Sequence, residues 1–253
     1  MYLPSDDSIL LADCLKEYHG NSALDIGLGS GIIAETLCRN FEYVVGSDIV
    51  IDTLESYKEN SVRYQKTDNK RSKYGNGFEL VCSDAAAAFR ANIFDLIVSN
   101  PPYLPDDYGY KGKRIYDKTI YGGATGIELT LCIVRSSIPS LVREGSIILI
   151  VSSLSDLSRL HQLTHQLDLN MRKITEKKLF FETISAMEIR FKFTKKRWWP
   201  FVLFPQHPCA QLGYLIRHFT ERSISPKIVG HIFVPVNNLL RSFKNGLCNI
   251  IFT

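Results

Sequence analysis

The fold is decided by residues 23–31, Ala23-Leu24-Asp25-Ile26-Gly27-Leu28-Gly29-Ser30-Gly31, in which a short apolar strand runs straight into a glycine-rich turn. Apolar residues at helical spacing follow the turn, from Ile32 to Cys38. A strand, a glycine turn and a helix in this order bring backbone N–H groups close to a polar or anionic ligand group. The glycines follow Gly-x-Gly-x-Gly, which is shorter than the pattern of dinucleotide binders, so the turn alone also fits a plain strand-to-helix connection.

Strands and helices alternate on both sides of this stretch. We expect helices at about 5–20, 50–60, 85–89, 127–142 and 154–167, and strands at 43–48, 78–84, 94–99 and 146–151. Polar loops are expected at 65–77 and 104–126, and two last strands, at 172–181 and 184–193, form a hairpin joined by Glu182-Thr183. The alternation predicts an α/β, Rossmann-like fold with helices on both faces and a mostly parallel sheet, whose final hairpin gives an antiparallel edge.

Three acids lie at or near the ends of successive strands. Asp25 precedes the first glycine inside an apolar strand, where a carboxylate is costly to bury unless it holds an ammonium or a hydrogen-bond network. Asp48 ends the next strand, where an acid accepts both hydroxyls of a ribose, and Asp84 ends the third, where an acid accepts from an adenine amino group. An ammonium, a ribose and an adenine together describe S-adenosylmethionine.

The strand at residues 94–99 stops abruptly at Asn100-Pro101-Pro102-Tyr103. It places one amide and one aromatic ring at the carboxyl edge of the sheet, where open α/β sheets bind ligands. An amide beside a rigid turn and a ring suits a site that grips a planar, nitrogen-bearing group.

With these motifs the chain resembles a class I methyltransferase that carries the Asn-Pro-Pro-Tyr signature, which N6-adenine DNA methyltransferases share with the HemK/PrmC-type glutamine methyltransferases of release factors. It is most similar to the short archaeal–eukaryotic release-factor branch. Three features favour that branch: the opening Tyr2-Leu3-Pro4-Ser5-Asp6-Asp7-Ser8, the extension Leu104-Pro105, and Gly122-Gly123-x-x-Gly126-x-Glu128, in which Thr125 stands where the pattern has an acid. The resemblance covers roughly residues 1–193.

The resemblance implies a site and a reaction. S-adenosylmethionine would be held by residues near the strand ends, namely Ser8, Asp25, Gly27, Gly29, Gly31, Asp48, Asp84 and Asn100. The catalytic residues would be Asn100, Pro101, Pro102 and Tyr103, with the Asn100 side-chain oxygen and the Pro101 carbonyl accepting the N–H groups of the reacting amide and Tyr103 packing against it. The expected reaction is N5-methylation of the glutamine in the Gly-Gly-Gln loop of a class 1 release factor.

Other interpretations stay open at this point. Adenine N6 presents the same planar amino group, so an N6-adenine or other nucleic-acid methyltransferase is the alternative, and a non-catalytic binding module that keeps the fold is a third. Asp7 and Ser8 serve equally well as helix N-caps. Family members pair an exposed apolar sheet edge with a small zinc-binding activator subunit, so the resemblance implies such a partner.

Charge divides the chain into two parts. Residues 196–253 hold seven Lys or Arg and one acid, which leaves 23 basic and 25 acidic residues, a net charge of −2, in residues 1–195. We expect a methyltransferase domain over 1–195 and a basic, aromatic extension without catalytic role over 196–253. A partner-binding or membrane-surface segment, or a product of altered reading near the true stop, are the other interpretations of the extension.

Cysteines and apolar runs bear on the compartment. The six cysteines are far apart and form no Cys-x-x-Cys pair, so the sequence predicts neither a zinc site nor a disulfide framework. The N-terminus lacks the basic and apolar regions of a signal peptide, and no apolar run reaches the length of a membrane span. We expect a cytoplasmic protein.

Overall fold

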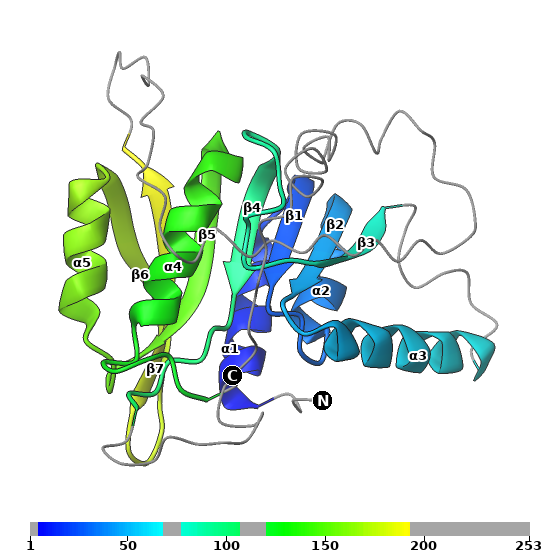
Figure 1. Cartoon of the computed structure of the whole chain (residues 1–253), viewed down its shortest axis with the longest axis horizontal. Helices are drawn as coiled ribbons and strands as arrows, with labels where there is room; N and C mark the ends of the chain where they lie inside the picture. The colour runs from blue at the N-terminus through cyan, green and yellow to red at the C-terminus, as the bar shows by residue number, and fades with distance from the viewer. Residues whose placement is uncertain (1–4, 68–76, 107–119, 193–253) are drawn as a thin grey trace, which may run out of the picture.

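A computed structural model describes residues 5–67, 77–106 and 120–192 of the chain, without the side chains of 61–67. These residues form one seven-stranded sheet in the order β3-β2-β1-β4-β5-β7-β6 (Figure 1). The strands are β1 (Gly20–Ile26), β2 (Phe41–Asp48), β3 (Phe78–Cys82), β4 (Phe94–Ser99), β5 (Leu141–Ser152), β6 (Leu169–Lys178) and β7 (Thr183–Phe191). Strands β1 to β5 pair in parallel, and β7 is antiparallel to both neighbours, β5 and β6. The predicted fold class and the antiparallel hairpin are confirmed.

The strand order reverses between β1 and β4. The chain builds outward from β1 to β3, then returns to the other side of β1 and continues outward through β4 and β5. Neighbouring connections leave the sheet on opposite faces at such a switch point, which opens a crevice at the carboxyl ends of the strands. The glycine turn follows β1 and Asn-Pro-Pro-Tyr follows β4, so both predicted motifs flank the switch point.

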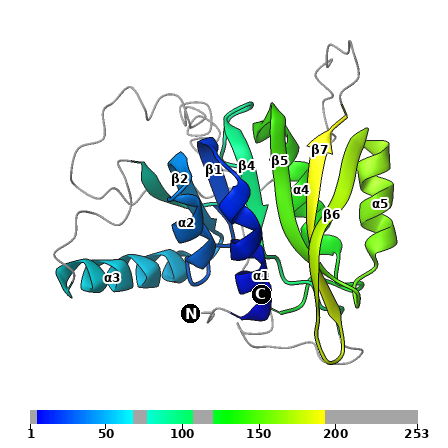
Figure 2. The same ribbon diagram turned by 180° about the vertical axis from the view of Figure 1, so that it is seen from behind.

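Helices cover both faces of the sheet (Figures 1 and 2). The helices α1 (Asp6–Cys14), α2 (Ile32–Leu37) and α3 (Ile51–Thr67) share one apolar cluster with one face. The helices α4 (Glu128–Ser137) and α5 (Leu157–Gln166) share the other cluster, and short 3₁₀ turns follow α1 (η1, Leu15–Glu17) and α4 (η3, Ile138–Ser140). Successive strand residues point to opposite faces, so Ala23 packs in one cluster and Leu24 in the other.

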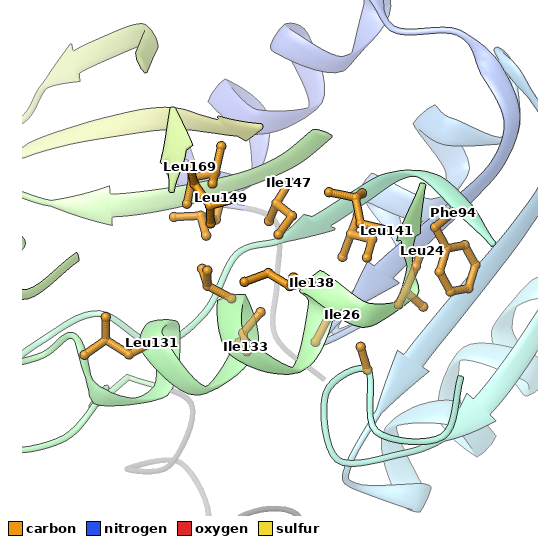
Figure 3. Close-up of a cluster of buried hydrophobic side chains, with 14 of the residues drawn as sticks. Leu24, Ile26, Phe94, Leu131, Ile133, Ile138, Leu141, Ile147, Leu149 and Leu169 are labelled. Carbon is orange, nitrogen blue, oxygen red and sulfur yellow. The ribbon is translucent and has the colours of Figure 1, made fainter. Parts of the chain in front are cut away.

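The core is continuous along the central strands. Figure 3 shows Leu131 and Ile133 of α4 at one end of this cluster, and Leu24 beside Leu141 and Phe94 at the other. The run from Ile147 to Val151 in β5 is at most 1% exposed, as expected for a strand covered on both faces. Burying each such side chain contributes about 1.5–3 kcal/mol relative to leaving it in water.

Several predicted element bounds were wrong. Residues 85–89 form turns instead of a helix, because Ala85 takes a left-handed φ of 46° that a helix does not allow. The helix predicted to reach residue 142 ends at Ser137, because Pro139 has no N–H to continue it. Conversely, α3 runs through Thr67 into the predicted polar loop.

The remaining differences concern chain ends and turns. The first helix stops at Cys14, and Gly20 already belongs to β1. The helix predicted from residue 154 begins at Leu157, after the N-cap Asp156 accepts from Ser158 N–H. The hairpin turn spans Leu179 to Glu182, where Leu179 N–H donates to the Glu182 carbonyl at 2.7 Å. No helix within the described ranges is long and apolar enough to cross a membrane. Residues 2–4 and the extension 196–253 lie outside the described residues, so the division at 195 stays a prediction.

Candidate active site

The glycine turn after β1 adopts a backbone that side chains would oppose. Gly27, Gly29 and Gly31 have positive φ angles of 82°, 50° and 81°. A Cβ on Gly31 would lie 2.0 Å from the ring of Tyr57, whereas a Cβ on Gly27 would meet no atom within 4 Å. The turn is fixed to β2 by two hydrogen bonds, from the N–H groups of Gly27 and of the following residue to the Ser47 carbonyl, at 2.8 and 2.9 Å. The space above Gly27 is therefore open, and its floor is held in place.

Asp25 is the most deeply buried of the three predicted acids. Its side chain is 1% exposed, and its Oδ2 accepts a hydrogen bond from Ala34 N–H at 3.1 Å. Burial raises the pKa of Asp25 well above its usual range, and the hydrogen bond from Ala34 opposes this only in part. No described cation pairs with it in the ranges that the structure covers. The carboxyl braces the start of α2 and would still gain from a bound positive charge.

Asp48 and Asp84 stand at the carboxyl edge as predicted. Asp48 ends β2 and accepts from Val50 N–H at 2.9 Å, with Gly29 N–H within 3.5 Å. Burial raises the pKa of Asp48 and that of Asp84, and backbone hydrogen bonds counteract the effect at Asp48. Three neighbouring acids whose charged forms are disfavoured are typical of a site that awaits hydrogen-bond donors.

Asn100 is fixed from one side only. Its Nδ2 donates to Ser8 Oγ at 3.1 Å, and Ser8, which is 4% exposed, lies in the first turn of α1. Its Oδ1 is buried and has no hydrogen-bond partner among the described residues. A buried acceptor without a partner costs free energy, so this oxygen would gain from a hydrogen-bond donor supplied by water or a ligand. The carbonyl of this amide is thus an unused acceptor at the sheet edge.

Asp7 sets the direction of these hydrogen bonds. Its Oδ1 accepts from Ser8 N–H at 2.6 Å and lies 3.4 Å from Ser8 Oγ, while its Oδ2 accepts from the Tyr103 hydroxyl at 3.1 Å. A carboxylate can only accept hydrogen bonds, so the Ser8 hydroxyl donates its hydrogen bond to Asp7. The lone pairs of the hydroxyl oxygen are then free to accept from Asn100. Asp7 thereby orients both the amide of Asn100 and the phenol of Tyr103.

The Asn-Pro-Pro-Tyr loop is locked against the predicted glycine segment. A Cβ on Gly122 would lie 2.3 Å from the Pro102 carbonyl oxygen, and one on Gly126 would lie 2.3 Å from that of Tyr103. Only glycine allows this approach of two backbones, and Gly126 also has a φ of 74°. Ser155 Oγ donates to the Tyr103 carbonyl at 2.6 Å from the loop after β5. Pro101 itself is buried, so the loop has little freedom to shift.

Glu128 holds the glycine segment in turn. It accepts from the N–H of Thr125 at 3.1 Å and from the Thr125 hydroxyl at 2.8 Å, and it pairs with Arg159 of α5. Burial raises the pKa of Glu128, but these hydrogen bonds outweigh burial and lower it to about 2. Glu128 is therefore a charged anchor that joins the glycine segment and α4 to α5.

The structure brings together most of the predicted site. Ser8 and Asn100 lie in contact, and the glycine turn and Asp48 lie in contact, on the two sides of the switch point. Neither Asp7 nor Ser8 is the N-cap of α1, because that position belongs to Ser5. Sequence reasoning missed the link from Asp7 to Tyr103, which spans 96 residues, and the anchor Glu128, which appeared only as part of a pattern.

These residues fit S-adenosylmethionine. The open space above Gly27, the buried carboxyl of Asp25 and the acceptors at Asp48 and Asp84 match the methionine, ribose and adenine groups in order along β1, β2 and β3. The unused Asn100 acceptor lies across the switch point, where a methyl-accepting group would meet the donor. No cluster of His, Cys, Asp or Glu suited to a metal ion occurs within the described ranges.

Comparison with known proteins points the same way. Residues 6–113 match the family model described as methyltransferase small domain. A ribosomal protein uL3 glutamine methyltransferase of Xylella fastidiosa is 35% identical over 136 residues, which are 50% of this chain and 39% of that protein. A putative protein N5-glutamine methyltransferase of Methanocaldococcus jannaschii is 28% identical over 156 residues, which are 60% of this chain and 72% of that one.

A solved structure shares the fold. One chain of the E. cuniculi Mtq2–Trm112 complex, described as responsible for methylation of the translation termination factor eRF1, has a TM-score of 0.54 and 23% identity, and covers 76% of this chain and 98% of its own. This chain spans only 39% of the Xylella relative's length, so that relative's activity does not transfer by itself. The described residues therefore share the Rossmann-like fold of that structure, and residues 6–113 match the model of the methyltransferase small domain.

Proposed function

We propose that this chain transfers a methyl group from S-adenosylmethionine to the side-chain amide nitrogen of a glutamine in a protein, and that the protein is a class 1 release factor. The observation that carries the proposal is the buried, unused Oδ1 of Asn100, held in place by Ser8 beside a glycine turn that fits the cofactor. The names of the Xylella and Methanocaldococcus relatives support glutamine as the acceptor. A release-factor substrate would place the reaction in the cytoplasm.

The cofactor would be held by Asp25, Asp48, Asp84 and the three glycines of the turn. Ser8, which the resemblance also assigned to the cofactor, would instead hold Asn100 through its hydroxyl. When bound, it supplies an electrophilic methyl group, whose bond to sulfur breaks and leaves its electron pair on sulfur. All other parts of the proposed reaction are performed by the residues around Asn100.

The difficulty of the reaction lies in the amide nitrogen. Its lone pair is delocalised into the carbonyl, so it is a poor nucleophile. Asn100 Oδ1 and the Pro101 carbonyl would accept its two N–H groups, which fixes its orientation and stabilises the positive charge that develops as the nitrogen bonds to carbon. The nitrogen then loses one proton to solvent. Tyr103, tethered to Asp7 at 3.1 Å, would form the wall against which the planar amide packs.

The test uses the full chain, tritiated cofactor and three acceptors: intact release factor, a release factor with Gln→Ala in the Gly-Gly-Gln loop, and duplex DNA. We expect label in the intact factor, recovered as N5-methylglutamine, and none in the other two. Equal labelling of the Gln→Ala factor would refute glutamine as the acceptor. Labelling of DNA alone would establish the nucleic-acid alternative, which presents the same planar amino group on adenine.

Asn100→Ala tests the role assignment within the same assay. We expect kcat to fall by about 100-fold or more, because a buried acceptor for the developing charge is lost, while the cofactor Kd changes by less than about threefold. Equal loss of both quantities would show that Asn100 serves cofactor binding and not the acceptor.

A small activator subunit is part of the proposal. The E. cuniculi protein was solved as a complex with Trm112, and we propose that this chain takes a small zinc-binding partner of that kind. Co-expression with the host's Trm112 homologue should raise the soluble yield and the turnover number. A fully active, well-behaved monomer without it would contradict this part.

A further inference from the structure

Two phenylalanines at the β6–β7 turn are the most exposed large apolar side chains in the described part of the chain. Phe180 is 93% exposed and Phe181 is 84% exposed, and the next, Ile49, is 65% exposed. The two rings contact each other edge to face, with centroids 4.6 Å apart and an interplanar angle of 82°. Adjacent exposed rings forgo the stabilisation that burial gives and are typical of a surface that a partner covers.

The turn lies at the edge of the sheet that carries the site. Because β7 is antiparallel to β5, with Ile184 opposite Ser152, the turn sits at the carboxyl ends of the parallel strands. Asn100 follows the carboxyl end of β4, which is parallel to β5. Both ribbon views show the β6–β7 turn projecting beyond the edge at which α1 begins (Figures 1 and 2).

The turn is braced, so its exposure is built into the fold. Thr183 N–H donates to Ser153 Oγ, and Ser153 N–H donates to the Thr183 carbonyl, both at 2.9 Å. Glu182 accepts from the hydroxyl of Ser152, and the side chain of Leu179 packs on the core. The residues on both sides of the two rings are fixed, and the rings between them face water.

Two routes connect this turn to the catalytic loop. In one, the braced segment that starts at Ser152 continues to Ser155, whose Oγ donates to the Tyr103 carbonyl at 2.6 Å. In the other, Lys177 Nζ lies 3.0 Å from Asp6 Oδ1, in the turn of α1 that also holds Asp7 and Ser8. The braced turn is therefore linked both to the Asn-Pro-Pro-Tyr loop and to the first turn of α1.

We propose that Phe180 and Phe181, with Leu154 on the adjoining loop, form a docking surface for the folded protein that presents the methyl-accepting glutamine. This inference rests on the proposed function. Asn100 can recognise only the amide of that glutamine, so selection of one folded protein requires contacts outside the reacting group. Leu154 is 47% exposed and lies in the braced segment next to the turn. Lys178 and Glu182 border the rings on either side, so the partner surface is an apolar patch with a polar rim that carries both charges.

The test compares two substrates for the full chain: intact release factor, and a short peptide that contains the Gly-Gly-Gln loop. In the double variant Phe180→Ser/Phe181→Ser we expect KM for the intact factor to rise about 30-fold, because aromatic anchors are the usual energetic centres of interfaces. Its kcat, its KM for the peptide and its Tm should stay within experimental error. The matched control Phe180→Leu/Phe181→Leu keeps apolar area and should lose less than about fivefold.

Each other outcome is decisive. An equal rise of KM for the intact factor and for the peptide would place the rings in the active site and refute docking. Unchanged kinetics on both substrates would also refute docking. A wild-type dimer that the Ser variant converts to monomer without a change in KM would assign the rings to a second copy. A lowered Tm in the Ser variant would show that another part of the chain itself covers the two rings, and would refute docking of a partner. Labelling of neither substrate by the wild-type chain would refute the proposed function, and the docking proposal would fall with it.

Discussion

Ser8→Ala is the sharpest test of the role proposed for Asn100, because it removes one buried hydrogen-bond acceptor and leaves the Asn100 side chain itself unchanged. Asn100 Nδ2 donates to Ser8 Oγ at 3.1 Å, and the serine is 4% exposed, so water cannot readily replace the hydroxyl. Leaving a buried donor without a partner costs about 1–3 kcal/mol. The Asn100 side chain can relieve this cost only by turning. Turning moves Oδ1 away from the N–H group of the methyl-accepting amide, which Oδ1 is proposed to orient.

If that cost is added to the activation free energy of methyl transfer, 1–3 kcal/mol corresponds to a fall in kcat of about 5- to 150-fold. The cofactor Kd should change far less, since the hydroxyl of Ser8 is already engaged with Asp7 and Asn100. Single-turnover methylation with saturating cofactor measures the first quantity, and isothermal titration calorimetry measures the second. A Kd that rises as much as kcat falls would refute the reasoning and make Ser8 a cofactor ligand.

Two controls frame this experiment. Ser8→Thr keeps a hydroxyl and should retain most of the turnover. Ser99→Ala removes a hydroxyl of the preceding residue that is also buried and donates to the Ile26 carbonyl at 2.9 Å, whereas the Asn100 amide donates to Ser8. It should lower Tm by a few degrees, at about 2–4 °C per kcal/mol, and leave kcat largely intact. A loss of turnover in Ser99→Ala as large as in Ser8→Ala would mean that general loosening, and not amide orientation, explains both.

Two further predictions concern groups of the candidate site, and a third concerns the ion pairs that Glu188 forms with Arg172 and Arg190 in the β6–β7 hairpin. Asp25→Asn should raise Tm of the ligand-free chain at pH 7, because burial raises the pKa of Asp25 and its charged form destabilises the fold. The gain in Tm should vanish below about pH 3.8, where the wild-type carboxyl is protonated in both the folded and the unfolded chain. Calorimetry should show that the variant binds the cofactor about tenfold or more weakly. Gly126→Ala should cut kcat by about 100-fold with cofactor affinity kept, because its Cβ would meet the Tyr103 carbonyl 2.3 Å away; normal turnover would contradict the locked loop. Glu188→Gln should lower Tm at pH 7, since a fully buried carboxylate that pairs with two arginines is lost. The hydrogen bonds from its partners lower the pKa of Glu188 against the effect of burial, so the difference in Tm from wild type should shrink as pH falls below about 4.5. A difference in Tm that does not depend on pH would refute the charge argument.

Local patterns in the sequence were sufficient to predict that the seven strands exist and where the edge of the site lies, although not every strand end. The glycine turn, Asp48 and Asn100 each lie at the end of an apolar strand, and the carboxyl ends of parallel strands meet at one edge of the sheet. Helix ends were harder to predict, because they depend on single residues such as Ala85, whose left-handed backbone stops a helix that its alanine-rich composition favours.

The hydrogen-bond order within the site could not be predicted. Asp7 and Tyr103 are far apart in sequence, and no local pattern shows that α1 lays its first turn across the loop after β4. A capping role was equally compatible with the composition of that turn, and only the packing of α1 on the sheet decides between the two. The exposure of Phe180 and Phe181 escaped prediction for a similar reason. Residues 180 and 181 were assigned to a strand, whereas the strand ends at Lys178 and the rings fall in the turn.

The chemistry at Asn100 does not by itself choose between a glutamine amide and an adenine amino group, because both present two N–H groups in a plane. A choice must come from the surface around the site. Duplex DNA carries one charge about every 1.7 Å and is bound chiefly through its phosphates, which requires a strongly basic surface. Residues 1–195 carry a net charge of −2, and the β6–β7 turn at the same edge of the sheet presents two phenyl rings. A surface of this kind gains little from a polyanion and much from an apolar protein patch, so the same edge that positions the amide also favours a protein as its bearer.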